Sequence, residues 1–187
     1  MAVNPQFKEE VSNMLYAAEG SGLGTCIQCG TCSGTCPAAS YMDYTPRRLI
    51  AMINAGYKDE VLASNTFWCC ASCYHCTVRC PSCIDIAEAM YALKRYSMWK
   101  GQYKEGLIGP VFSQAFVKTI IRSGRSYEPL LAPTYIFSYG VNKFFQEAFN
   151  ATNLMLKGRL PLLPPRIKRL ENFRRMIAHI ILLGYVS

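Results

Sequence analysis

The chain has 187 residues, of which 51% are hydrophobic, and a formal net charge of +8. This length suits one domain or one domain with an extension, and the apolar content is too high for a chain that is disordered throughout. All ten cysteines lie between positions 26 and 83, so redox or metal chemistry is confined to the first half of the chain.

The first half of the chain is expected to be helical on both sides of its cysteine-rich loops. Four stretches place apolar residues at the intervals of an α-helix, and they cover residues 5–19, 46–55, 58–64 and 84–99. Thr45 and Pro46 are the expected N-cap and first residue of the second helix. We find no convincing pair of alternating strands, and an all-α fold is therefore predicted.

Two cysteine runs share the spacing C-x2-C-x2-C-x3-C-P. They read CIQCGTCSGTCP from Cys26 to Pro37 and CASCYHCTVRCP from Cys70 to Pro81. This run binds 4Fe-4S clusters, and in two-cluster proteins its fourth cysteine binds the other cluster. Matching cysteines are 44 residues apart, which indicates a pseudo-symmetric duplication. Since the spacer between the runs carries helix patterns, an α-helical ferredoxin core is favoured over the small βαβ form.

We therefore predict two 4Fe-4S clusters, each bound by both runs, and no catalytic residue. The expected ligands are Cys26, Cys29, Cys32 and Cys80 for cluster 1, and Cys70, Cys73, Cys76 and Cys36 for cluster 2. Cys69 and Cys83 fall outside the spacing and are interpreted as packing thiols. A basic residue such as Arg79, beside Cys80, should favour the reduced state of a cluster.

Other uses of the cysteines fit the sequence less well. Structural zinc needs four ligands in one closed tetrahedron, not eight thiolates in two matched runs. A Rieske centre needs two histidines at one iron, whereas the runs contain only His75. A disulfide framework requires a secreted chain, and no signal sequence precedes the first run, so a reducing cytoplasm is expected.

The second half is also predicted to be helical. Expected elements are a helix from Pro110 to Ser123, another from Pro133 toward Lys157, and a proline-rich connector leading into a basic amphipathic helix that carries Leu170, Phe173, Ile177 and Ile181. The predicted domains are residues 1–100, which hold the clusters, and residues 101–187, a helical extension for docking to a neighbouring protein of the same complex.

Basic residues of the second half have three possible partners. They are Lys157, Arg159, Arg166, Lys168, Arg169, Arg174 and Arg175. Without a nucleic-acid motif, nucleic acid is not expected. Docking to a neighbouring subunit is the preferred interpretation, and peripheral membrane attachment is the second. The C-terminal run IAHIILLGYVS is too short for a bilayer, which needs about 20 residues, so no transmembrane span is predicted.

The two cysteine runs, the helical spacer and Trp68, two residues before Cys70, resemble the C-type subunit of heterodisulfide reductase and its relatives. The similarity is specific over about residues 20–100 and looser beyond them. It implies an α-helical ferredoxin with a helical extension, whose eight ligand cysteines match those named above. It also implies electron transfer between a flavin-containing A-type subunit and a catalytic B-type subunit.

The sequence has features of a relay and not of the active site. It lacks the distant C-x2-C of the family's B-type subunit, a G-x-G-x-x-G run and a P-loop. Within the family, reduction of the coenzyme M–coenzyme B disulfide and sulfur oxidation remain open, and SGRSYEPLLAPTYIF looks slightly more like the second branch. The alternatives are an iron-sulfur subunit of a membrane-associated dehydrogenase, such as anaerobic glycerol-3-phosphate dehydrogenase, and a non-redox scaffold.

Overall fold

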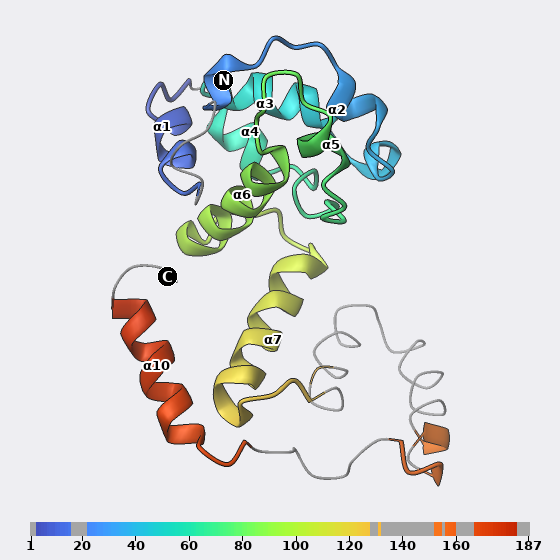
Figure 1. Cartoon of the computed structure of the whole chain (residues 1–187), viewed down its shortest axis with the longest axis vertical. Helices are drawn as coiled ribbons and strands as arrows, with labels where there is room; N and C mark the ends of the chain where they lie inside the picture. The colour runs from blue at the N-terminus through green and yellow to red at the C-terminus, as the bar shows by residue number, and fades with distance from the viewer. Residues whose placement is uncertain are drawn as a thin grey trace. The chain divides into compact units, whose positions relative to one another are not determined.

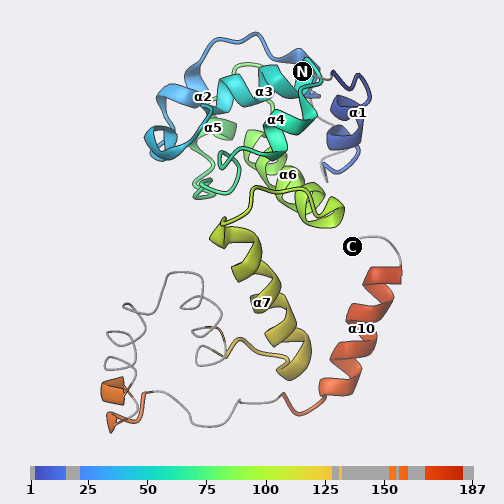
Figure 2. The ribbon, with the colours of Figure 1, turned by 180° about the vertical axis from the view of Figure 1, so that it is seen from behind.

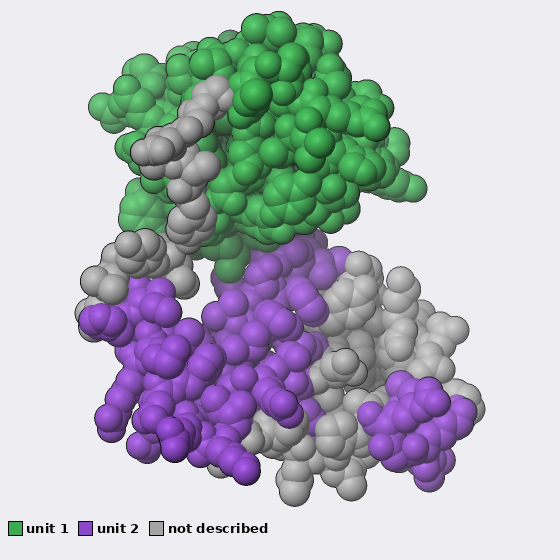
Figure 3. Space-filling model, viewed as in Figure 1, with its two compact units in different colours: residues 1–105 green, residues 106–187 purple. Residues whose placement is uncertain are grey.

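The computed structural model describes residues 3–15, 22–127, 131, 152–154, 156–159 and 167–182. It contains two compact units, Met1–Glu105 and Gly106–Ser187 (Figure 3). Every regular element in the described ranges is a helix (Figure 1). The prediction of an all-α, ferredoxin-like fold is therefore confirmed.

The first unit is built from six α-helices and two 3-10 turns. These are α1 (Phe7–Ser12), η1 (Leu23–Thr25), α2 (Thr31–Gly34), η2 (Ala39–Tyr41), α3 (Pro46–Asn54), α4 (Lys58–Leu62), α5 (His75–Val78) and α6 (Ile86–Lys100). The short helices α2 and α5 lie beside each other, and α1 packs on α3 and α6 (Figures 1 and 2). Each cysteine run thus forms a loop followed by a one-turn helix.

A single apolar core joins these helices. Residues such as Phe7, Leu49, Ile53 and Leu93 are fully buried in it. Cysteines of both runs pack against the same core, and Cys32 is only 8% exposed. The cysteine loops are therefore anchored to the folded unit and do not extend from it as separate lobes.

The first helix is shorter than its sequence pattern predicts. The helix expected over residues 5–19 ends at Ser12 within the described residues. Met14 and Leu15 still pack against the core, but from a turn. The carbonyl oxygen of Met14 accepts a hydrogen bond from Arg95 of α6 at 2.6 Å. That carbonyl is thus satisfied by tertiary structure and not by another turn of helix.

Glu10 links α1 to two other helices. Its carboxylate accepts hydrogen bonds from the Tyr96 hydroxyl at 2.7 Å and from Lys58 Nζ at 3.2 Å. The Tyr96 hydrogen bond, helped by Lys58, holds the pKa of Glu10 below its ordinary value of 4.5. A carboxyl whose pKa is lowered on folding stabilises the fold above its unfolded pKa and loses that contribution as pH falls.

We expect Glu10→Gln to destabilise the protein at pH 7, because the amide keeps the shape but not the charge. The difference from the parent should shrink as pH falls from about 6 to about 4, where the parent carboxylate also becomes protonated. Urea unfolding at a series of pH values measures it. Glu9→Gln, at an exposed position of the same helix, is the control, and equal effects of both substitutions would contradict the prediction.

The second unit contains α7 (Ile108–Ser123) and α10 (Leu170–Leu182). The helix expected to begin at Pro110 starts two residues earlier. Arg174 of α10 donates hydrogen bonds to the carbonyls of Ile121 and Arg122, at the C-terminal end of α7. This is a favourable place for a cation. One of the basic residues assigned to partner contact therefore also serves inside the fold.

Other predictions for the second half fall on residues that the structure does not describe. Most of the helix expected from Pro133 toward Lys157 and most of the proline-rich connector lie outside the described ranges. Among the described residues, no helix combines the length and the apolar character needed to cross a membrane.

Candidate metal centres

Four cysteines line a small cavity at the first cysteine run, which we call cavity 1. Cys26, Cys29 and Cys32 come from the loop and α2, and Cys80 comes from the end of the second run. Pro81, Ser82, Ile86 and Arg47 complete the lining together with residues of the first loop. The fourth cysteine of the second run therefore lies with the first three cysteines of the first run.

Cavity 2 has the reciprocal arrangement at the second run. Its cysteines are Cys70, Cys73, Cys76 and Cys36. Pro37, Met42, Pro46, Ala87 and Met90 are among the other lining residues. These two sets of four are the ligand sets proposed from the sequence for clusters 1 and 2. The assignment remains a prediction, and this grouping supports it.

The two loops share an unusual backbone. Gln28 and Gly30 have φ values of 58° and 85°, and the residues 44 positions later, Ser72 and Tyr74, have φ values of 55° and 60°. A left-handed conformation costs a non-glycine residue about 1 kcal/mol or more. Alternating left-handed residues turn the chain between successive cysteines, so that three sulfurs line one cavity. This strain is stored where the cysteines converge.

A hydroxyl in each cysteine run caps the helix that follows it. Ser33 Oγ accepts a hydrogen bond from the Arg47 N–H at 3.0 Å, and Thr77 Oγ1 accepts one from the Ala87 N–H at 3.1 Å. Ser33 and Thr77 are 44 residues apart, and Arg47 and Ala87 are the second residues of α3 and α6. Free N–H groups at a helix start need such partners. The caps fix both helix starts against the cavities.

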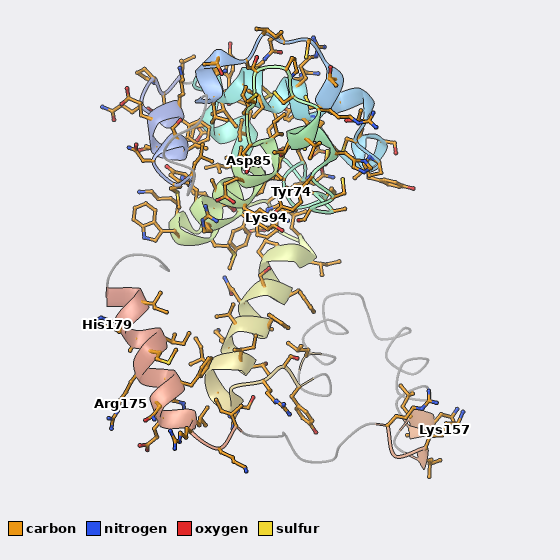
Figure 4. The ribbon with its side chains drawn as sticks, in the orientation of Figure 1. Tyr74, Asp85, Lys94, Lys157, Arg175 and His179 are labelled. Carbon is orange, nitrogen blue, oxygen red and sulfur yellow. The ribbon has the colours of Figure 1, made fainter. Side chains whose placement is uncertain are left out.

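The Thr77 cap is the stronger of the two, because its hydroxyl also donates to Asp85 Oδ1 at 3.0 Å. Asp85 in turn accepts from the Glu88 N–H at 3.0 Å (Figure 4 shows its place at the start of α6). Thr77→Ala is expected to lower the free energy of unfolding by about 1–3 kcal/mol, and Ser33→Ala by about 1 kcal/mol. Urea unfolding of the cluster-loaded protein measures both changes.

Thr35→Ala is the control for the cap variants, because its hydroxyl bonds only the Thr31 carbonyl of the same turn, at 2.9 Å. It should change stability less than either cap variant. A Thr77→Ala protein as stable as the Thr35→Ala protein would contradict the capping role.

The surroundings of the cysteines discourage bare thiolates in the two buried positions. Burial raises the pKa of the Cys32 thiol and raises the pKa of the Cys76 thiol to about 11. At exposed Cys29 the pKa is lowered, chiefly by the hydrogen bond with Thr31. Iron binds the thiolate and releases its proton. A cluster therefore supplies the positive charge that the buried sulfurs lack.

The chemistry of both cavities fits a 4Fe-4S cluster. Each offers four thiols and an apolar wall, which is the donor set of a cubane cluster. In the part of the chain that the structure describes, no three Cys, His, Asp or Glu side chains are grouped to hold a single metal ion. Zinc requires four ligands within about 2.3 Å of one point. The wider grouping of four cysteines suits a cluster, which binds one thiolate at each of its four irons.

The cysteines outside the spacing line neither cavity. The Cys69 thiol donates to the Tyr41 carbonyl at a sulfur–oxygen distance of 3.6 Å, and burial raises its pKa. Cys83 is exposed. These positions agree with the interpretation of both as packing or surface thiols.

Sequence reasoning named Arg79 and missed Arg47. Arg79 is exposed and lines neither cavity, whereas Arg47 lines cavity 1. His75 begins α5 and is exposed. The signal that could have found Arg47 is Pro46, which marks a helix start that must be capped close to the first cysteine run.

Comparison with known proteins gives the same cofactor. Residues 22–84 match the family described as a 4Fe-4S dicluster domain. With the ten cysteines of the chain, this domain fits two 4Fe-4S clusters, as predicted.

Three relatives share the cysteine-rich part of the chain, and each is the C-type subunit of its enzyme. The chain is 40% identical over 82 residues to that of the H2:CoB-CoM heterodisulfide,ferredoxin reductase of Methanothermobacter marburgensis, covering 44% of each chain. It is 35% identical over 103 residues to the iron-sulfur protein of the CoB-CoM heterodisulfide reductase of Methanopyrus kandleri, covering 53% of this chain and 54% of the relative. It is 37% identical over 93 residues to that of the ferredoxin:CoB-CoM heterodisulfide reductase of Methanosarcina mazei, covering 50% and 56%.

The match spans about half the length of each of these relatives. It covers the part of the chain that carries the two cavities. The resemblance inferred from the cysteine runs is confirmed, and the cysteine-containing part of this chain is a 4Fe-4S dicluster domain similar to that of the C-type subunit of heterodisulfide reductases.

Proposed function

We propose that this chain is the electron-transfer subunit of a heterodisulfide reductase or of a similar complex. The observation that carries the proposal is the grouping of four cysteines, three from one run and one from the other, around each of two cavities. Two clusters held by the same two loops form a short electron path. A scaffold would need only one cluster to join the loops.

The chain's own residues hold and expose the clusters. Cys32 and Cys76 anchor them to the apolar core, while Cys29 and Cys73 lie at exposed positions. When bound, the clusters supply one-electron oxidation and reduction. The exposed cysteines place one edge of each cluster close to solvent, where a redox partner can approach.

The partners follow from the relatives' printed names, which describe one component of a heterodisulfide reductase complex. We propose a flavin-containing A-type subunit as one partner and a catalytic B-type subunit with thiol or disulfide chemistry as the other. Residues 101–187 are proposed to dock a partner, because α7 exposes the apolar side chains of Val111, Phe112 and Val117. Reduction of a heterodisulfide and oxidation of carrier-bound sulfur both fit this relay.

The first test is the iron and acid-labile sulfide content of the anaerobically purified full chain, with EPR after dithionite reduction. We expect about eight of each and signals from two interacting 4Fe-4S centres. Zinc or a single cluster would overturn the proposal. Two clusters that no physiological reductant reduces would favour a structural scaffold instead.

The second test identifies the partners. The full chain, tagged and isolated anaerobically from its own cells, should bring down a flavoprotein and a cysteine-rich protein. The reduced clusters should then be reoxidised by that complex when it is given a heterodisulfide or a persulfide substrate. A complex that contains a glycerol-3-phosphate dehydrogenase would assign the chain to that enzyme instead.

A further inference from the structure

The two halves of the iron-sulfur unit match in backbone and caps but differ in polar side chains around the cavities. Gln28 and Thr31 of the first loop correspond, 44 residues later, to Ser72 and His75 of the second. The second residue of the following helix is Arg47 in one half and Ala87 in the other. Each comparison of matched positions isolates a difference between cavities 1 and 2.

Two side chains bond cysteine sulfurs at cavity 1. Gln28 Nε2 donates to Cys26 Sγ at 3.3 Å, and Thr31 Oγ1 lies 3.4 Å from Cys29 Sγ, to which it donates when the sulfur is a thiolate ligand. At the matched positions, the Ser72 hydroxyl is held by the Tyr91 hydroxyl at 2.6 Å. Across the described residues, neither Ser72 nor His75 has a hydrogen bond to a cysteine sulfur.

A cation also lies at cavity 1. The Arg47 side chain lines the cavity and passes over the first loop, with its Cδ 3.6 Å from the point where a side chain on Gly30 would begin. No carboxylate forms an ion pair with Arg47 in the described ranges. Its counterpart Ala87 is buried and neutral. The positive charge therefore acts on the contents of cavity 1 without a neutralising partner beside it.

Cavity 2 has a cation nearby, but in a weaker position. Lys94 of α6 (Figure 4) donates to the Cys70 carbonyl at 3.4 Å and lies 5.5 Å from the centre of the Tyr91 ring. It does not line cavity 2. The carbonyl and the ring face thus receive much of its charge before the cluster does.

Hydrogen bonds to sulfur and nearby positive charge both stabilise the more negative, reduced state of an iron-sulfur cluster. We propose that cluster 1 has the higher reduction potential of the two, and that Arg47, Gln28 and Thr31 set this difference. One electron then passes downhill from cluster 2 to cluster 1, oxidising cluster 2 and reducing cluster 1, with no bond or proton changing place. This inference rests on the ligand sets of the proposed function.

The test is an EPR-monitored redox titration of the cluster-loaded full chain and of its Arg47→Gln variant. Signals altered in Cys29→Ser identify cluster 1. We expect two midpoint potentials, the higher belonging to cluster 1. Since Arg47 is exposed and partly screened, its loss should weaken reduction of cluster 1 threefold to tenfold, about 30 to 60 mV for one electron, and leave cluster 2 unchanged.

Three variants distinguish charge from structure. Arg47→Lys should restore the midpoint of cluster 1, because it keeps the charge. Arg48→Gln removes the same charge from the next residue, which lies over the Tyr44 ring at 5.0 Å and outside cavity 1, and should shift neither cluster. Lys94→Gln should lower the midpoint of cluster 2 alone.

Equal midpoints, a lower midpoint for cluster 1, or an Arg47→Gln shift confined to cluster 2 would each overturn the inference while leaving the relay itself intact. If Arg47→Gln loses iron, Arg47 holds the cluster and does not tune it. The ranking is then tested with Thr31→Val, which removes one hydrogen bond and no charge. A chain without two 4Fe-4S clusters would instead overturn the proposed function.

Discussion

Replacing Cys80 with serine is expected to remove or disrupt cluster 1, although Cys80 belongs to the second cysteine run. Its sulfur lines cavity 1 with Cys26, Cys29 and Cys32 and does not line cavity 2. Iron should fall from about eight to about four per chain. The EPR spectrum that remains should match that of Cys29→Ser, because both variants would retain cluster 2.

Cys83→Ser is the matched control, since Cys83 follows Cys80 by three residues and lines neither cavity. It should keep about eight irons and both sets of signals. Loss of iron in Cys83→Ser would show that the ligand register is wrong. A Cys80→Ser spectrum that matches Cys73→Ser would show that each run holds its own cluster without crossover.

The ligand sets could be proposed from sequence because cysteine spacing constrains them strongly. Helices α3 and α6 were also predictable, as Pro46 and Gly101 mark a start and an end that the structure reproduces. The first helix was predicted too long, because the packing of Met14 and Leu15 on the core gives the same apolar pattern as a helix. Periodicity reports burial, and a turn against the core also satisfies it.

The finer features of the site depend on tertiary contacts. Left-handed backbone at Tyr74, which has a side chain, is not signalled by residue type as it is at Gly30. Arg47 reaches cavity 1 because Ser33 fixes the start of α3 there. The paired caps Ser33 and Thr77 did carry a signal, since both are hydroxyl residues at the 44-residue offset. Comparing the halves position by position would have predicted them.

Removing the clusters is expected to destabilise the first unit far more than any single side-chain change. Cys32 is buried and Cys26, Cys70, Cys76 and Cys80 are partly buried against the apolar core, so their loops are part of that core. Structural metal sites contribute on the order of 10 kcal/mol to folding in small domains. Without iron, the strained loop backbone has no compensating bonds, and the helix starts capped from these loops lose their anchor.

Circular dichroism at 222 nm during heating, before and after anaerobic chelation of iron, measures this effect. The loaded protein should show a cooperative transition that moves down by more than about 10 °C, or disappears, on chelation. Helices α7 and α10 contain no cysteine, so part of the helical signal should persist in the cluster-free chain. An unchanged transition would mean that the core of the first unit folds independently of its clusters, and that the cysteine loops are held by the caps at Ser33 and Thr77 alone.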